Sequence, residues 1–214
     1  MLNRFARALV TRLLTPAARA LLALGISPDA VTLVGTLGVA FGALAFYPRG
    51  SFFWGTVVIT LFVFSDTVDG IMARLRGRPS TWGAFLDSTL DRFGDAAVFS
   101  GLVLYWAIHP RERWATAFVA LALACLVFGQ IVSYARARAE GLGMTAAVGV
   151  AERADRLVAV LLTTGLVGLG LPPVVLLVVL ALLAVASLVT VVQRVLVVRR
   201  QAFAALEEQE SARA

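Results

Sequence analysis

Two pairs of aspartates stand close together in the first half of the chain, within a sequence that is otherwise strongly apolar. Asp66 and Asp69 are three residues apart, and Asp87 and Asp91 are four apart. On α-helices, these spacings place the two carboxylates of each pair on one face. A short turn at residues 77–81 joins the two stretches, so an antiparallel helix hairpin would bring the four carboxylates together. The pattern therefore predicts a site built from carboxylates.

The chemistry open to such a site follows from its charge. Four packed carboxylates repel one another unless they are protonated or neutralised, and Mg²⁺ takes oxygen ligands and commonly bridges phosphates as well. Two divalent ions could polarise a diphosphate and stabilise the leaving group in a displacement at phosphorus. Two alternatives stay open: structural pairing with Arg74 and Arg92, and a cation or proton transporter, which prefers carboxylates spread through the depth of the bilayer.

The composition places these aspartates in a membrane. Of 214 residues, 60% are apolar and 15% charged, against about 45–50% and about 25% in soluble domains. This excludes a water-soluble globule and a disordered chain. The single cysteine, Cys125, excludes an internal disulfide framework and a cysteine-based zinc site. All 19 basic residues are arginines, and the net charge of +6 indicates a membrane-lipid surface as partner, with no nucleic acid.

Six apolar stretches are long enough to cross the hydrocarbon core as helices. Residues 1–24 carry four arginines, no acidic residue and apolar side chains at helical spacing, which predicts an interfacial amphipathic helix on anionic lipid. The fold class is therefore an all-α integral membrane protein, with six transmembrane helices and an N-terminal juxtamembrane helix. We divide it into an interfacial helix (1–25), a six-helix domain (26–200) and a polar C-terminal tail (201–214). The predicted spans cover about 30–47, 52–72, 82–108, 114–134, 157–171 and 173–198.

The arginines also predict the orientation. With the N-terminus inside, fourteen arginines fall in inside segments and three in outside loops, which satisfies the positive-inside rule. Both termini and the aspartate end of the hairpin are therefore expected on the cytoplasmic side of the cell membrane. Trp54, Trp82, Trp106 and Trp114 fall near the predicted interfaces, as in an aromatic belt.

The residues between the aspartate pairs add a family resemblance. The stretch from Asp66 to Asp91 resembles the CDP-alcohol phosphotransferase signature D-x2-D-G-x2-A-R-x8-G-x3-D-x3-D, with every fixed position present. The resemblance implies six transmembrane helices, a homodimer and a site for two divalent ions, Mg²⁺ or Mn²⁺, that opens to the cytosol. It also implies an enzyme that transfers a phosphatidyl or related group from a CDP-linked lipid to an alcohol and releases CMP.

Carried onto this chain, the resemblance assigns roles to individual residues. Asp91 would be the general base that accepts the proton of the attacking hydroxyl. Gly70 would leave room for the nucleotide, Arg74 would grip the diphosphate, and Gly83 would let the facing helix approach. The implied metal ligands are Asp66, Asp69, Asp87 and Asp91. The other implied contacts of the CDP-lipid are Ser80 and the segment Asp29, Ala30, Val31 and Thr32, for which a plain helix cap is the alternative.

The similarity extends over nearly the whole chain to one group of this family, the actinobacterial phosphatidylinositol phosphate synthases. It includes the segments 133–140 and 152–156 and the pair Gln193-Arg194. The group implies CDP-diacylglycerol and 1D-myo-inositol 3-phosphate as substrates. The alternative within the family is a phosphatidylglycerophosphate synthase that uses glycerol 3-phosphate, although Ser88 and Arg92 stand where those enzymes typically carry proline and lysine.

Four arginines are candidates for binding the phosphate of the acceptor. They fall at the predicted cytoplasmic ends of three helices, so together they could bind a phosphate monoester beside the metal site. The positive-inside bias alone also explains arginines there, except that Arg194 lies within an apolar run. The four are Arg136, Arg153, Arg156 and Arg194.

Overall fold

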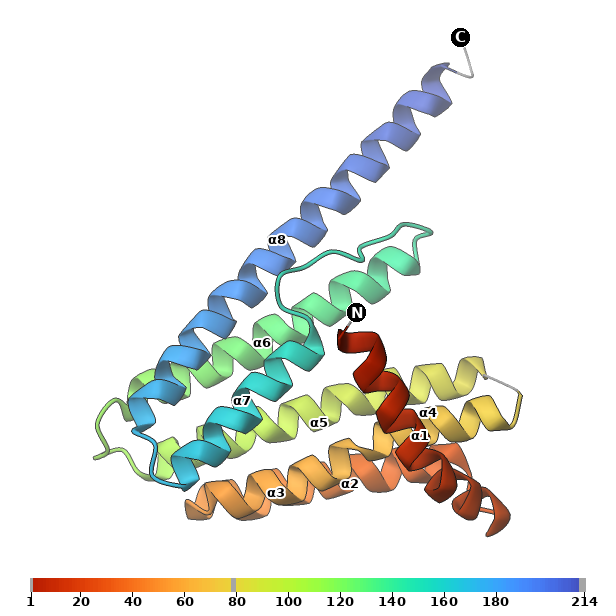
Figure 1. Ribbon diagram of the computed structural model, residues 1–214. Helices are drawn as coiled ribbons and strands as arrows, with labels where there is room; N and C mark the ends of the chain where they lie inside the picture. The colour runs from red at the N-terminus through yellow and green to blue at the C-terminus, as the bar shows by residue number, and fades with distance from the viewer. Residues whose placement is uncertain (1, 78–79, 212–214) are drawn as a thin grey trace. The chain divides into compact units, whose positions relative to one another are not determined.

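The computed structural model describes residues 2–77 and 80–211, without the side chains of residues 2–10, 66, 206, 208 and 209. Every regular element in these ranges is a helix, which confirms the predicted all-α class (Figure 1). Each of the six apolar stretches forms helix, the second of them as two segments. The elements are α1 (Leu2–Ala23), α2 (Pro28–Phe46), the 3-10 turn η1 (Tyr47–Arg49), α3 (Phe52–Val63), α4 (Ser65–Leu75), α5 (Thr81–Ile108), α6 (Ala115–Glu140), α7 (Arg153–Gly168) and α8 (Pro173–Ser211).

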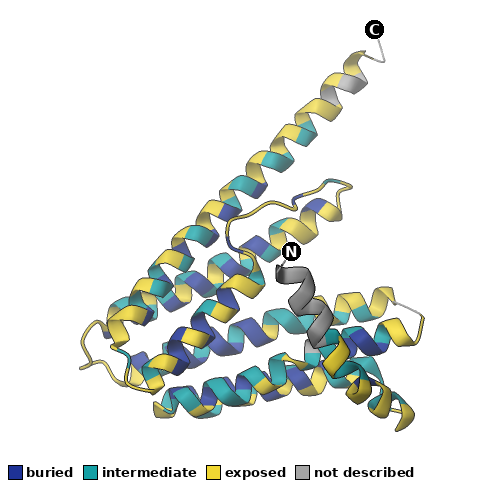
Figure 2. Ribbon diagram, viewed as in Figure 1, coloured by how far each residue is buried: buried dark blue, intermediate teal, exposed yellow. Residues whose placement is uncertain are grey.

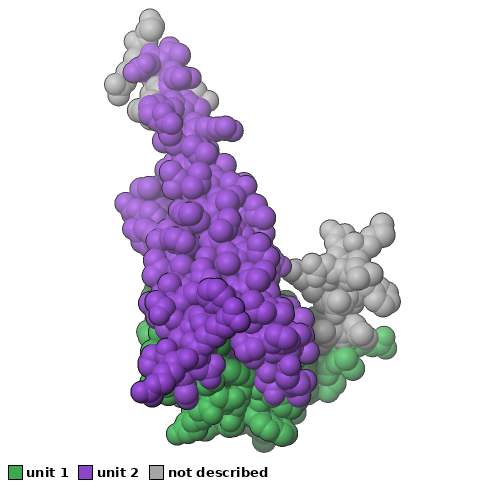
Figure 3. All heavy atoms as spheres, turned by 90° about the vertical axis from the view of Figure 1, so that its left-hand side faces the viewer, with its two compact units in different colours: residues 1–108 green, residues 109–214 purple. Residues whose placement is uncertain are grey.

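The chain divides into two compact units, residues 1–108 and residues 109–214 (Figure 3). The first unit contains α1 to α5 and all four signature aspartates. The second contains α6, α7 and α8 with the four candidate arginines.

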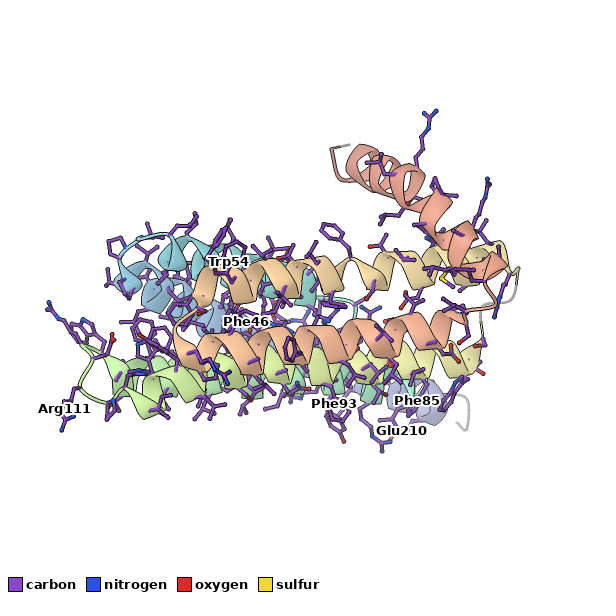
Figure 4. The ribbon with its side chains drawn as sticks, turned by 90° about the horizontal axis from the view of Figure 1, so that it is seen from below. Phe46, Trp54, Phe85, Phe93, Arg111 and Glu210 are labelled. Atoms are coloured by element: carbon purple, nitrogen blue, oxygen red, sulfur yellow. The ribbon has the colours of Figure 1, made fainter. Side chains whose placement is uncertain are left out.

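In the first unit, α2 is the central helix and packs against α3, α4 and α5 (Figure 4). Small residues on α2 make this packing close. A Cβ atom on Gly35 would lie 1.7 Å from Ser65 Oγ, and one on Gly38 would lie 2.2 Å from Phe62 Cγ. Because any larger residue at these two positions would overlap the neighbouring helices, the glycines let the backbones approach.

The two aspartate helices, α4 and α5, do not pack directly against each other, so the predicted antiparallel hairpin is wrong in this respect. α4 and α5 make few direct contacts: α5 packs mainly on α2, whereas α4 packs about equally on α1 and α2. Figure 4 shows α2 lying between the α3–α4 pair and α5. The C-terminal end of α4 and the N-terminal end of α5 therefore border a common space together with the N-terminus of α2. This separation suits two helices that both carry carboxylates, because like charges disfavour close packing.

The N-terminal segment is helical, as predicted, over Leu2–Ala23. It packs against α4, where the fully buried Ala18 contacts Ile71 and Met72 and Leu14 is half-buried beside them. Leu13 points away and is 68% exposed. Part of the apolar face thus packs on the protein itself, while the side chains of residues 2–10, on which the interfacial prediction also relied, are outside those described.

In the described part of the chain, four helical stretches are long and apolar enough to cross a membrane. They are Pro28–Arg49, Phe52–Leu75, Ala115–Glu140 and Pro173–Ala205. The two other predicted spans form α5, which carries Asp87, Asp91, Arg92 and Asp95, and α7, which has only 16 residues. Large apolar side chains are exposed along α8, as on a lipid-facing surface (Figure 2).

The tryptophans correct one prediction. Trp54, Trp82 and Trp114 are more than half exposed, as aromatic-belt residues would be, but Trp106 is 2% exposed. Its ring stacks on Phe52, with centroids 5.6 Å apart. Trp106 is therefore a core residue of the first unit, because it lies on the face of α5 that meets the start of α3.

In the second unit, α8 packs against both α6 and α7. Side chains of α8 also hold the segment that joins α6 to α7. Thr190 Oγ1 accepts hydrogen bonds from the N–H groups of Val150 and Ala151, at 3.1 and 3.2 Å, and Gln201 Oε1 accepts one from Thr145 N–H at 3.0 Å. α8 continues to Ser211, so most of the predicted polar tail is helical.

Candidate active site

A cavity of about 630 Å³ opens in the first unit where three helix ends meet. The N-terminus of α2, the second half of α4 and the N-terminus of α5 contribute its walls. Six of the residues predicted to bind the CDP-lipid, and two of the predicted metal ligands, line it. The lining residues are Ser27, Pro28, Asp29, Thr32, Asp69, Gly70, Ala73, Arg74, Arg76, Ser80, Gly83, Ala84 and Asp87.

The carboxylates of the signature occupy different environments. Asp69 is 6% exposed, and its Oδ2 accepts a hydrogen bond of 2.5 Å from Thr32 Oγ1. Asp87 is exposed and lines the cavity. Asp91, one turn further along α5, is half-buried, and its Oδ2 lies 3.5 Å from Arg92 Nη2, while the cavity lining does not include it. The side chain of Asp66 is outside those described.

These residues fit a divalent cation that also takes ligands from a phosphate. Among the side chains that the structure describes, no three of the types His, Cys, Asp and Glu lie close enough to hold a metal ion by themselves. However, Mg²⁺ in phosphate-transfer sites is commonly bound by one or two carboxylates plus water and substrate phosphates. Asp69 and Asp87 supply two carboxylates from separate helices to one cavity, which is a suitable donor set.

Two arginines bring positive charge to the same cavity. Arg74 was predicted from the signature and is exposed in the cavity wall. Arg76 was not predicted as a site residue; it lines the cavity, and its Nη2 donates to Ile26 O at 3.4 Å. Because guanidinium groups bind phosphate oxygens bidentately, Arg74 and Arg76 provide a cationic wall that suits a diphosphate.

The two signature glycines keep the cavity open. A Cβ atom on Gly70 would meet only Arg74 Nη1, at 3.7 Å, so a side chain there would project into the cavity. A Cβ on Gly83 would lie 3.0 Å from Ser80 Oγ and 3.8 Å from Asp29 Oδ1. The hydroxyl of Ser80 accepts a hydrogen bond from Gly83 N–H at 2.9 Å and so caps α5.

The start of α2 meets the prediction in part. Ser27 Oγ accepts a hydrogen bond from Ala30 N–H at 3.1 Å, the predicted helix cap. Asp29 and Thr32 line the cavity, whereas Ala30 is exposed outside the lining and Val31 packs against the core formed with α1 and α4. On a helix only every third or fourth residue shares a face, so the four consecutive residues could not all face one ligand.

Trp82 is a further residue that sequence reasoning missed. Its Nε1 donates a hydrogen bond to Asp29 Oδ2 at 3.1 Å. This bond joins the start of α5 to the start of α2 at the wall of the cavity. The sequence analysis interpreted Trp82 as an aromatic-belt residue, and nothing in the local sequence indicates a contact with Asp29, which lies 53 residues away.

The candidate acceptor arginines lie in the second unit, and the structure separates them by burial. Arg194 is 5% exposed, and it donates from Nε to Val148 O at 2.9 Å and from Nη1 to Val132 O at 2.5 Å. Arg156 is 2% exposed and donates from Nη1 to Ala151 O at 3.2 Å. Both buried guanidinium groups therefore hold backbone of the second unit together.

The other two candidates are more accessible. Arg136 is exposed and forms an i, i+4 salt bridge with Glu140, at 2.9 Å. Arg153 is half-buried at the first position of α7. Arg153 and Arg156 are three positions apart in the first turn of α7, so their side chains lie on the same face of the helix.

Residues 25–151 match the sequence profile of the CDP-alcohol phosphatidyltransferase family. The chain belongs to this family. The match includes the whole signature and every residue that lines the cavity. The resemblance drawn from the aspartate spacing is thereby confirmed, and the chain is a member of a family of metal-dependent enzymes that act on CDP-linked alcohols.

Individual relatives are similar over most of their length. The phosphatidylinositol phosphate synthase of Streptomyces avermitilis is 54% identical over 211 residues, covering 96% of this chain and 85% of that protein. The enzyme of the same name from Cutibacterium acnes is 49% identical, covering 79% and 80%.

Solved structures of the Mycobacterium tuberculosis phosphatidylinositol phosphate synthase have the same fold. The structure with CDP-DAG bound matches with a TM-score of 0.82 at 45% identity and covers 87% of this chain and 94% of that one. The structure in complex with manganese and citrate matches with a TM-score of 0.82 at 44% identity and covers 86% and 88%.

Proposed function

We propose that this enzyme transfers the phosphatidyl group of CDP-diacylglycerol to 1D-myo-inositol 3-phosphate, forming phosphatidylinositol phosphate and CMP. The observation that carries the proposal is the cavity in which signature residues of α4 and α5 meet the start of α2. The names of the relatives support the choice of substrates, since the similar proteins from Streptomyces and Cutibacterium are phosphatidylinositol phosphate synthases. The solved Mycobacterium relative with CDP-DAG bound supports the choice of the donor.

In this proposal, Asp66, Asp69, Asp87 and Asp91 hold two divalent ions. The ions, Mg²⁺ or Mn²⁺, would neutralise the carboxylates and polarise the diphosphate when bound; manganese in the solved relative supports this assignment. Arg74 and Arg76 bind the diphosphate from the cationic wall of the cavity. Gly70 leaves the space into which the nucleotide fits.

The nucleoside is assigned to the wall formed by Asp29, Ser80 and Gly83. A carboxylate is an acceptor of hydrogen bonds, so Asp29 suits donors such as ribose hydroxyls or the cytosine amino group and disfavours the diphosphate. Trp82 holds Asp29 Oδ2 and thereby fixes the orientation of that carboxylate. The Ser80 hydroxyl can donate its proton to a ligand while its oxygen caps α5.

Asp91 is proposed as the general base. It accepts the proton of the acceptor hydroxyl as that oxygen bonds to the phosphorus that carries the diacylglycerol. The bond between that phosphorus and the bridging oxygen of the diphosphate breaks, and CMP leaves. The half-buried position of Asp91, one turn beyond Asp87 on α5, suits a group that receives a proton next to the reacting phosphate.

Arg136, Arg153, Arg156 and Arg194 are proposed to bind the phosphate of the acceptor. A guanidinium has five N–H donors, so Arg194 can bind phosphate in addition to the two backbone carbonyls. Arg136 and Arg153 are the more accessible members. We assign the first contact with phosphate to these two and a supporting role to the buried pair.

The proposed setting is the cell membrane, with six spans, cytoplasmic termini, a cytoplasmic active site, an N-terminal interfacial helix and a homodimer. In this proposal α5 crosses the membrane with its charged side chains facing the protein interior, and Asp95 is already buried there. α7 is about 24 Å long, and the residues that follow it up to Leu171 are also apolar. With them it approaches the hydrocarbon thickness of about 30 Å.

The test is CMP release from CDP-diacylglycerol by the purified protein with Mg²⁺ and 1D-myo-inositol 3-phosphate. We expect release that chelation of the metal abolishes and that Asp91→Asn lowers by about 10²- to 10⁴-fold. Asp155→Asn is a matched control on α7 and should remain active. Absence of CMP release by the wild-type protein, or full activity of Asp91→Asn, would contradict the mechanism.

A further inference from the structure

Thr32 connects the central helix to the buried signature aspartate. It lies on α2 one turn beyond Asp29, it is 6% exposed, and it lines the cavity together with Asp69 of α4. Its Oγ1 lies 2.5 Å from Asp69 Oδ2 and 3.1 Å from Pro28 O. The hydroxyl has a single proton, and the shorter contact to the charged group takes it.

The length of this bond gives it a specific character. A distance of 2.5 Å falls in the range of about 2.5–2.7 Å for hydroxyl groups that donate to a carboxylate, and such bonds are roughly twice as strong as neutral ones. Both partners are buried, so little water competes with the bond. The bond therefore holds the plane of the Asp69 carboxylate with Oδ2 directed toward α2.

We propose that Thr32 is a positioning residue for divalent-cation binding, acting through the orientation of Asp69. This inference rests on the proposed function, in which Asp69 is a metal ligand. Hydrogen bonds from neighbouring side chains to metal-ligating carboxylates fix their orientation, and the loss of such bonds commonly costs 10- to 100-fold in metal affinity or activity. The role differs from a contact with the CDP-lipid, because it acts on the metal site when no nucleotide is present.

The experiment is a titration of the purified full-length protein with Mn²⁺ alone, followed by the electron paramagnetic resonance signal of free Mn²⁺. Thr32→Val removes the hydroxyl while keeping the shape of the side chain, and Thr32→Ser keeps the hydroxyl. Thr36→Val is the matched control, since Thr36 lies one turn further along α2 and its Oγ1 donates to Thr32 O at 3.0 Å. We expect Thr32→Val to weaken Mn²⁺ binding by about 10- to 100-fold, with Thr32→Ser and Thr36→Val within about threefold of the wild type.

Thermal unfolding of each variant without metal distinguishes an effect on the stability of the protein from an effect on Mn²⁺ binding. A Thr32→Val protein that melts earlier but binds Mn²⁺ with wild-type affinity would overturn the inference. A double variant provides a second test: if Thr32 acts through Asp69, then Thr32→Val adds no further loss of affinity to Asp69→Asn. Additive losses would contradict the coupling.

The outcome is distinguishable from a failure of the proposed function. Wild-type protein that binds Mn²⁺ but releases no CMP would refute the proposed reaction and leave the role of Thr32 to be decided by the variants. Wild-type protein that binds no Mn²⁺ would overturn both the metal site and the role of Thr32. Weak Mn²⁺ binding by Thr32→Ser as well as by Thr32→Val would show that the hydroxyl is not the cause.

Discussion

Substituting Gly70 by alanine should change stability and activity in opposite directions. Gly70 lies in the middle of α4, where alanine is favoured over glycine by about 1 kcal/mol. The added Cβ would meet only Arg74 Nη1, at the ordinary contact distance of 3.7 Å. The folded protein therefore accepts the methyl group, and the free energy of unfolding should rise by up to about 1 kcal/mol, or about 2–4 °C in melting temperature.

The same methyl group projects into the cavity assigned to the nucleotide. Overpacking by one methyl group costs about 1–3 kcal/mol, which corresponds to a loss of about 5- to 150-fold. We expect Gly70→Ala to lower kcat/KM for CDP-diacylglycerol by that factor. The assay is CMP release at varied CDP-diacylglycerol and saturating acceptor, alongside thermal unfolding of the same preparation.

Gly94→Ala is the matched control. Gly94 is also a helical glycine, and a Cβ there would likewise meet a single neighbour, Val39 Cγ1, at 3.7 Å, but it does not line the cavity. Gly94→Ala should gain similar stability and keep wild-type activity. If Gly70→Ala is at least as stable as the wild type and retains its kcat/KM for CDP-diacylglycerol, the nucleotide does not lie against Gly70.

Two further predictions concern contacts that the sequence did not reveal. Arg194→Met removes two hydrogen bonds to backbone carbonyls, each worth about 1.5–3 kcal/mol for a charged donor. The free energy of unfolding in detergent should therefore fall by about 3 kcal/mol or more. Arg136→Met, at an exposed position, is the control, and equal melting temperatures of the two variants would refute a structural role for Arg194. Trp82→Phe removes the donor to Asp29 Oδ2, a bond worth about 0.5–1.5 kcal/mol, and should raise the KM for CDP-diacylglycerol about 2- to 12-fold with kcat unchanged. Trp54→Phe, at another exposed tryptophan, serves as its control, and equal KM values for the two variants would show that Trp82 does not position Asp29.

The helices and the signature were predictable because they are local properties of the chain. Apolar stretches mark the helices, Ser27 marks the start of α2, and i, i+3 and i, i+4 spacing places the aspartates on helix faces. The end of α8 was harder to predict, because the polar residues after Arg200 form helix without an apolar stripe.

The arrangement of the helices around the cavity depends on packing between distant segments. The placement of α2 between α4 and α5 was not predicted, although Gly35, Gly38 and Gly42 form a stripe of small residues that signals a close helix contact. Arg76 and Trp82 contact the site through the start of α2 and the turn before it, where Arg76 Nη2 donates to Ile26 O and Trp82 Nε1 donates to Asp29 Oδ2. Such contacts have no signature in local spacing.

The arginines of the second unit show the same limit. The charge asymmetry predicts on which side of the membrane they lie, but it does not distinguish the exposed Arg136 from the buried Arg194. Arg194 is buried because it lies within the apolar run of α8 and finds carbonyl partners on α6 and on the α6–α7 connection. A buried guanidinium needs such partners, and only the tertiary fold identifies them.

The most direct test of the proposed reaction is a competition between acceptors. The purified protein is incubated with CDP-diacylglycerol, Mg²⁺ and equal concentrations of 1D-myo-inositol 3-phosphate, glycerol 3-phosphate and free inositol, and the lipid products are identified by mass spectrometry. The proposed function predicts phosphatidylinositol phosphate as the dominant product. Phosphatidylglycerophosphate as the dominant product would retain the metal site and contradict the assignment of the acceptor, and the absence of any new phospholipid would contradict the transfer reaction itself.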